Sequence, residues 1–149
     1  MKELLPEKLD KPWVVLLEAA RKVRLKAYCP YSGFQVGAAL LCGNGEIVSG
    51  ANVENAAYGS TICAERSAIV RANAMGFRDF SRMVVSVRAG TSSAPTEPAA
   101  PCGACRQMLN EFVALVGGEL QILLHGEGCQ KVRLTSIAEL LPHGFEIQE

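Results

Sequence analysis

Two short segments carry three thiols and a carboxylate. If these groups form one site, that requirement constrains the fold more than any other feature of this sequence. The segment "TICAERSAI" contains Cys63 and Glu65, and the segment "PCGACRQ" contains Cys102 and Cys105. Each segment opens a run of helical character, and Pro101 suits the first turn of a helix. A chain that brings the three thiols to one point must therefore place two helix N-termini face to face.

Thiols at helix N-termini ionise readily, because the unpaired N–H groups there carry partial positive charge. Three thiolates, from Cys63, Cys102 and Cys105, suit Zn²⁺. A structural zinc normally has four protein ligands, whereas three ligands and an open position are typical of a catalytic site that activates water. Glu65 can take a proton from such a water without ligating the metal. We therefore expect one Zn²⁺ per chain with Glu65 as the proton-transferring residue.

Other uses of the cysteines remain open at this point. Cys102 and Cys105 alone could form a redox pair or half of a structural zinc site. A fourth thiolate, from Cys29, Cys42 or Cys129, would favour a non-catalytic zinc-stabilised module. Without such a role, we interpret these three as small apolar residues.

Composition and the N-terminal segment narrow the class of protein. The chain has 149 residues and a formal net charge of zero, which predicts one domain over 1–149 and argues against long-range attraction to nucleic acid or membrane. The N-terminal apolar run is short and is interrupted by Glu18, unlike a signal peptide or a membrane span. We therefore expect a cytoplasmic protein with reduced cysteines rather than a disulfide framework.

Periodicity and turn residues predict an α/β fold. Apolar residues from Trp13 to Ala27 recur at helical spacing, and the basic residues among them (Arg21, Lys22, Arg24 and Lys26) are interpreted as a solvated face. A hairpin signal lies at 43–45. Helices are expected over 63–75, from 101 to about 116, and at "SIAELL"; further extended segments are "RMVVSVRAG", "ELQILLH" and "KVRLT". We predict a three-layer α/β/α sandwich with a mixed sheet of about five strands.

Four segments in order give the chain a close resemblance to a known family. They are "AYCPYSGFQVGAAL", "GANVENAAYGSTICAERSAI", "PCGACRQMLNEF" and "ELLPHGF". Together they resemble the small, homotetrameric, three-cysteine branch of the cytidine deaminases. The resemblance implies zinc-dependent hydrolysis of cytidine and deoxycytidine to uridine, deoxyuridine and ammonia, as in pyrimidine salvage.

The same resemblance implies a role for each matching residue. Cys63, Cys102 and Cys105 match the zinc ligands, and Glu65 matches the proton shuttle. The substrate-binding positions are Phe34 in the nucleoside pocket, Asn52 and Glu54 at the ribose hydroxyl, Ala64 through its backbone at the base, and Tyr58 and Phe145 lent by neighbouring subunits. Arg66 matches an arginine that hydrogen-bonds a zinc-bound sulfur and so offsets the negative charge of three thiolates.

Two further functions use the same chemistry. One is deamination of another aminopyrimidine nucleoside such as blasticidin S. The other is polynucleotide editing, which the neutral charge and the lack of a basic, aromatic-studded segment disfavour.

Overall fold

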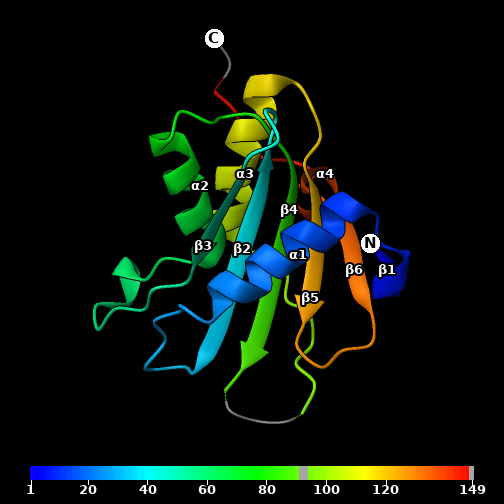
Figure 1. Cartoon of the computed structure of the whole chain (residues 1–149). Helices are drawn as coiled ribbons and strands as arrows, with labels where there is room; N and C mark the ends of the chain where they lie inside the picture. The colour runs from blue at the N-terminus through cyan, green and yellow to red at the C-terminus, as the bar shows by residue number, and fades with distance from the viewer. Residues whose placement is uncertain (91–93, 148–149) are drawn as a thin grey trace.

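The computed structural model, which describes residues 1–90 and 94–147, is a three-layer α/β/α sandwich around a mixed sheet (Figure 1). The sheet contains β1 (Lys2–Leu4), β2 (Phe34–Cys42), β3 (Ile47–Ala51), β4 (Phe80–Ala89), β5 (Gln121–Gly126) and β6 (Val132–Ser136). The helices are α1 (Lys11–Arg24), α2 (Ala64–Ala74), α3 (Gly103–Val116) and α4 (Ile137–Leu140), with short 3₁₀ turns at Pro6–Lys8 and Tyr58–Ser60.

The strand order is β1-β6-β5-β4-β2-β3, and β4 and β5 form the parallel pair within an otherwise antiparallel sheet. The sheet has six strands instead of about five, because β1 adds to its edge beside β6. Three residues are too few to show a period of two, and Pro6 follows soon after, so this segment carries no strand signal.

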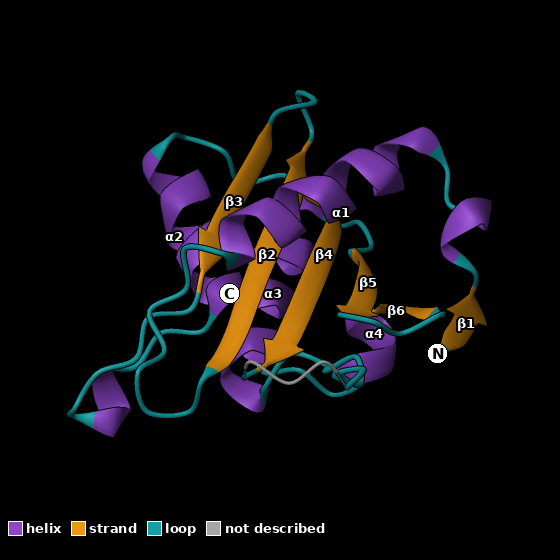
Figure 2. Ribbon diagram, turned by 60° about the horizontal axis from the view of Figure 1, so that its bottom comes forward, coloured by secondary structure: helices purple, strands orange, loops and turns teal. Residues whose placement is uncertain are grey.

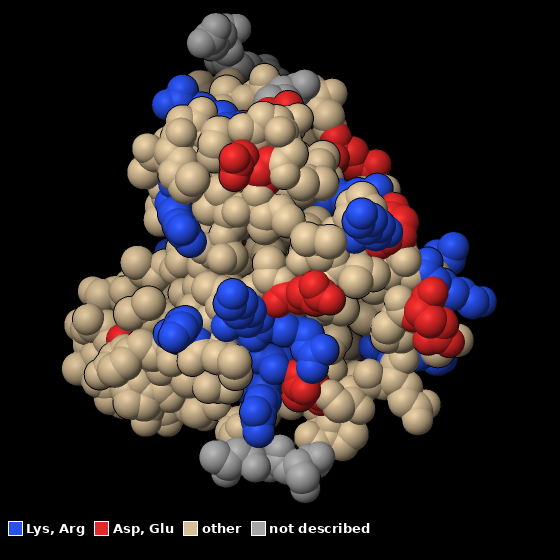
Figure 3. Space-filling view, in the orientation of Figure 1, with Lys and Arg blue, Asp and Glu red and all other residues tan. Residues whose placement is uncertain are grey.

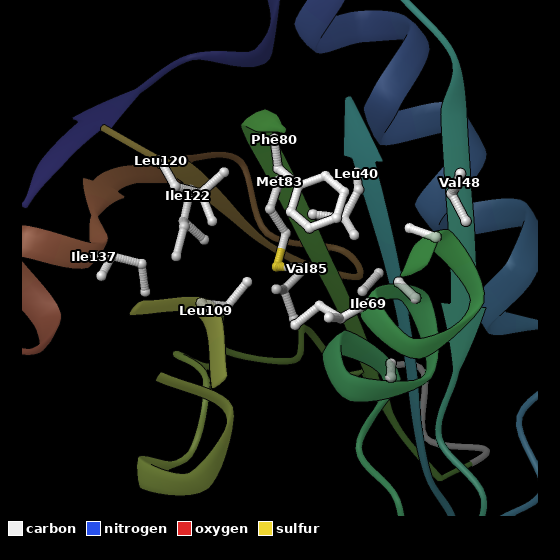
Figure 4. Packing of buried hydrophobic residues seen from close by; sticks show 14 of the residues in the cluster. Leu40, Val48, Ile69, Phe80, Met83, Val85, Leu109, Leu120, Ile122 and Ile137 are labelled. Atoms are coloured by element: carbon white, nitrogen blue, oxygen red, sulfur yellow. The ribbon is translucent and has the colours of Figure 1, made fainter. Parts of the chain in front are cut away.

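Residues alternate along the central strands between two apolar cores. Leu40, Met83 and Ile122 face α2, α3 and α4, together with Ile69, Leu109 and Ile137 from those helices (Figure 4). The neighbouring residues Ala39, Val84 and Leu123 face α1 and pack with Trp13, Leu16 and Ala20. Figure 2 shows α1 on one side of the sheet and α2 and α3 on the other, as expected from the sequence.

Two glycines let the helices lie directly on the sheet. A Cβ at Gly37 would meet the backbone of α1 at Ala20 and Arg24, and a Cβ at Gly50 would meet the backbone of α2 at Ser67 and Ala68. The second contact fixes the position of α2, whose first turn carries the predicted site.

Arg24 corrects the interpretation of the basic residues in 21–26 as a solvated face. Its side chain is buried at the end of α1, where Nη1 donates to Ser86 Oγ at 2.9 Å and to the Val87 carbonyl at 3.2 Å. Nη2 donates to Glu127, and Ser86 Oγ lies 3.0 Å from His125 Nδ1. Arg24 follows Ala20 by four residues and so lies on the inner face of α1.

On the face drawn in Figure 3, basic and acidic side chains lie close to one another, with the basic ones gathered over the lower half. Among residues 1–90 and 94–147, none of the helices combines the length and the apolar composition that a membrane span requires.

Candidate metal centre and active site

The predicted thiols lie at the starts of two helices. Cys63 is the N-cap of α2, Cys102 is the N-cap of α3, and Cys105 lies in the first turn of α3. An N-cap side chain usually accepts a hydrogen bond from the helix backbone. Neither Cys63 nor Cys102 does so, which leaves both sulfurs available to a metal ion.

The spacing of the sulfurs fits one zinc ion. The Cys63 and Cys102 sulfurs are 3.9 Å apart, those of Cys102 and Cys105 are 3.6 Å apart, and all three lie within 4.8 Å of one another. Tetrahedral Zn–S bonds of about 2.3 Å require sulfurs about 3.8 Å apart. All six cysteines are free thiols, and within 1–90 and 94–147 no other cysteine joins this cluster. The donors therefore form a three-sulfur zinc site.

Hydrogen bonding within the cluster favours one thiolate at Cys63. Cys105 above all, with Arg66 and Cys102, lowers the pKa of the Cys63 thiol to about 5, against the effect of burial. The same contact raises the pKa of Cys105, and burial adds to this. One thiolate thus forms readily, and its negative charge opposes ionisation of the next thiol. A bound dication is therefore needed to hold several thiolates together.

Glu65 lies in the first turn of α2, next but one to Cys63, and its side chain is only 4% exposed. Burial is the main cause that raises the pKa of Glu65 to about 7, and the negative charge of Cys63 adds to it. The carboxyl group belongs to the pocket that Cys63 and Cys102 also line. This position agrees with proton transfer beside a metal.

Arg66 lies beside the thiols on the next position of α2. Its Nη2 donates to the Thr61 carbonyl at 3.0 Å, and its positive charge helps to lower the pKa of Cys63. Among the described residues, Nε of Arg66 is buried without a hydrogen-bond partner, as is Nε of Arg24 on the opposite face. An unpaired donor next to the sulfurs is available to a thiolate ligand.

A pocket of about 210 Å³ opens beside the thiols. Its lining includes Cys63, Cys102, Glu65, Phe34, Asn52 and Glu54, so six of the predicted residues meet in one place. Cys105 is buried behind it. The other lining residues are Val36, Val85 and Val87 of the sheet, Ala99 and Ala100 before α3, and Ser32, Thr61 and Ile62.

Asn52 and Glu54 both line this pocket, and each is held by the chain. The Asn52 side chain is buried, and its amide bonds the backbone of Phe34 and Val36. Glu54 accepts hydrogen bonds from residues 31 and 32, and these lower its pKa, with the hydroxyl of Ser32 as the largest cause. Glu54 is therefore an ionised acceptor at the pocket.

Three of the predicted residues do not line this pocket, and for two of them, Tyr58 and Phe145, the prediction concerns the pockets of neighbouring subunits. Ala64 is fully buried and does not line the pocket. Tyr58 is 76% exposed and borders an adjoining open hollow together with Tyr31. The two tyrosine rings lie edge to face, with their centroids 6.0 Å apart. Phe145 is 70% exposed and lines neither.

The sequence interpretation missed Ser32 and the valine walls. Ser32 stands in "CPYSGF", within a motif of the resemblance, but the resemblance implies no role for it. Val85 and Val87 carried no signal beyond that of a strand, because the side facing the pocket depends on tertiary packing.

Comparisons with known proteins agree with this geometry. The family model for the "cytidine and deoxycytidylate deaminase zinc-binding region" matches residues 14–116. The chain is 41% identical over 135 residues to a cytidine deaminase of Halalkalibacterium halodurans, covering 91% of this chain and 95% of the relative.

Solved structures of similar proteins have the same fold. The cytidine deaminase of Burkholderia pseudomallei is 43% identical with a TM-score of 0.76, covering 89% of this chain and 98% of that one. The cytidine deaminase of Mycobacterium tuberculosis is 33% identical with a TM-score of 0.71, covering 93% and 100%. With the three-sulfur site and its buried glutamate, these matches show that the chain belongs to the zinc-binding cytidine and deoxycytidylate deaminase family.

Proposed function

We propose that this protein is a zinc-dependent enzyme that hydrolyses cytidine and deoxycytidine to uridine and deoxyuridine with release of ammonia. One observation carries the proposal: a three-sulfur site and a buried glutamate share one pocket with a fixed amide and carboxylate suited to a nucleoside. The named relatives, which are cytidine deaminases, support the choice of substrate.

Cys63, Cys102 and Cys105 would hold the zinc, and Arg66 offsets part of their negative charge. Zinc bound there supplies Lewis-acid chemistry that makes a water molecule acidic near neutral pH. Glu65 takes a proton from the water that adds to C4 of the base and gives a proton to ring N3. It then assists protonation of the amino group as the C4–N bond breaks, so that water and cytidine yield uridine and ammonia.

The other predicted residues orient the nucleoside. The ring of Phe34 lines the pocket beside the base. The family resemblance also assigns a contact with the base to the backbone of Ala64, which lies at the start of α2 between the pocket residues Cys63 and Glu65. Asn52 and Glu54 bind a hydroxyl of the sugar, which we take to be the 3′ one. Because the 3′ hydroxyl is present in both sugars, deoxycytidine is accepted as well.

We propose a homotetramer in which Tyr58 and Phe145 complete the pockets of neighbouring subunits. The large exposed fraction of both rings supports this role. Phe145 is also fixed in place: Gln107 of α3 donates to its carbonyl at 2.7 Å and accepts its N–H at 3.0 Å. An exposed aromatic ring on a fixed backbone suits insertion into a partner.

Residues 1–149 are proposed to form one deaminase domain that serves pyrimidine salvage in the cytoplasm. The continuous sheet supports one domain, and the six free thiols fit a reducing compartment.

A purified-protein assay tests the activity. We expect ammonia release and loss of the cytosine absorbance with cytidine, and a loss of both signals after zinc is chelated. Blasticidin S is the comparison substrate. Faster ammonia release from blasticidin S than from cytidine would make blasticidin S the proposed substrate. X-ray absorption should count three sulfurs and one lighter ligand; four sulfurs would instead support a non-catalytic module.

A further inference from the structure

The hydroxyl of Ser32 lies between two of the proposed substrate contacts. Ser32 Oγ accepts the backbone N–H of Phe34 at 3.0 Å and also hydrogen-bonds Glu54 Oε1. A backbone N–H can only donate, so Oγ is the acceptor in the first bond. The single hydroxyl proton is therefore free to be donated to Glu54, and the direction of both bonds is fixed.

The same loop holds the second oxygen of Glu54. Oε2 accepts the backbone N–H of Tyr31 at 2.9 Å and that of Ser32 at 3.3 Å. An ionised carboxylate offers about four acceptor sites. Three are used by this loop, so the one that remains is on Oε1, the oxygen to which the Ser32 hydroxyl donates.

Asn52 is fixed in the same way from the other side of Phe34. Its Oδ1 accepts the N–H of Val36 at 2.8 Å, and its Nδ2 donates to the carbonyl of Phe34 at 2.9 Å. These partners fix which end of the amide is oxygen and which is nitrogen. Hydrogen bonds thus run from Glu54 through Ser32 and the Phe34 backbone to Asn52. Of these four residues, Ser32 is the one to which the sequence analysis assigns no role.

Ser32 and Glu54 both border the pocket that contains the thiols and the adjoining hollow beside Tyr58. We propose that Ser32 is a positioning residue for the sugar of the nucleoside: its hydroxyl holds the free acceptor of Glu54 where a sugar hydroxyl donates. This inference rests on the proposed function. Ser32 itself acts through Glu54 and need not touch the reacting atoms.

Removal of this hydroxyl should weaken binding more than chemistry. In Ser32→Ala the Oε1 atom of Glu54 loses its donor, and the carboxylate reorients toward water. The sugar hydroxyl is bound alike in the ground state and the transition state, so KM should rise about tenfold with kcat nearly unchanged.

The experiment compares Ser32→Ala with wild type on two substrates, cytidine and 2′,3′-dideoxycytidine, which lacks both ring hydroxyls. We expect kcat/KM to fall about tenfold for cytidine and to change by less than about twofold for the dideoxy compound. Ser32→Thr, which keeps the hydroxyl, should restore activity on cytidine. Ser81→Ala removes an exposed serine hydroxyl of β4 outside both hollows and is the matched control.

A structural role for Ser32 would lower the rates on both substrates equally, and that result, or an unchanged KM for cytidine, would overturn the proposal. So would a Ser32→Thr variant as poor as Ser32→Ala. In a Glu54→Ala background, Ser32→Ala should have no further effect on cytidine. A wild-type protein that is inactive on cytidine would overturn both the proposed function and the role of Ser32. If wild type is active but Ser32→Ala loses the same share of kcat/KM on both substrates, only the role of Ser32 is overturned.

Discussion

Two polar clusters lie on opposite faces of the same sheet, and they balance charge in different ways. On the α1 face, Arg24 donates to Ser86 and Glu127, and Ser86 contacts His125. On the α2 and α3 face, Cys63, Cys102 and Cys105 crowd together near Glu65. The first cluster pairs opposite charges, whereas the second gathers groups that become negative.

The pKa shifts differ between the two clusters. Arg24 lowers the pKa of Glu127, and burial lowers the pKa of His125 to about 4, so that this ring stays neutral. In the thiol cluster, burial raises the pKa of Glu65 and the Cys63 thiolate opposes a second one at Cys105. A cluster that only stabilises the fold contains its own counter-charge, but the thiol cluster needs a cation from outside.

The largest expected effect comes from loss of a zinc ligand. Cys105→Ala should abolish zinc binding and lower kcat/KM at least about 10³-fold, because two sulfurs cannot hold the ion tightly. Zinc content and cytidine turnover measure this. Cys129→Ala, which removes a half-buried thiol outside the cluster, should keep its zinc content and its turnover. One zinc ion per chain in Cys105→Ala would contradict the claim that the thiol cluster depends on a cation while the Arg24 cluster does not.

Glu65→Gln comes next and separates metal binding from proton transfer. The amide keeps the shape of the side chain but cannot accept the proton, so we expect kcat to fall about 10³-fold with zinc content unchanged. Metal analysis on the same sample as the kinetics is the check. Normal turnover by this variant would remove Glu65 from the mechanism.

Arg24→Met tests the balanced cluster. The variant removes hydrogen bonds to Ser86, Val87 and Glu127 in a buried place, so the free energy of unfolding should fall by roughly 2 kcal/mol. Arg21→Met is the matched control, because Arg21 contacts the same carboxylate at 3.3 Å from a half-exposed position and should cost under about 0.5 kcal/mol. Equal losses in urea denaturation would contradict a special role for the buried partner.

The smallest expected effect concerns His125 and acid. Its pKa is lowered to about 4 in the folded chain from an ordinary 6.5, so between these values only the unfolded chain takes up the proton. Stability contributed by neutral His125 is present above about pH 6.5 and is lost as the pH falls toward about 4. The charged groups that face His125 are Arg21, Arg24 and Glu127, and hydrogen bonding by Arg24 lowers the pKa of Glu127.

His125→Gln should therefore reduce the pH dependence of unfolding. We expect the loss of stability between pH 7 and pH 5 to be smaller than in wild type by roughly 1–2 kcal/mol. Denaturation curves at the two pH values provide the measurement, and parallel behaviour of both proteins would show that His125 titrates normally.

The sequence predicted best what depends on local spacing. The helix starts at Cys63 and Cys102 and the end of α3 at Val116 were confirmed, because caps and periodicity are encoded within a few residues. The assignment of Arg24 to solvent was wrong, since its partner Glu127 is 103 residues away and helical spacing does not identify such a partner. Ser32 was overlooked for a related reason, because its bond to Glu54 spans 22 residues.

One strand belongs to both clusters. Ser86 of β4 faces the Arg24 cluster, while its neighbours Val85 and Val87 line the pocket beside Cys63 and Cys102. The Val87 carbonyl accepts hydrogen bonds from Arg24 and from the backbone of Glu127. We expect substitutions along α1 to alter the ratio of kcat/KM values for cytidines of different size. The width of the pocket can thus be changed by substitutions in α1, a helix that does not line the pocket itself.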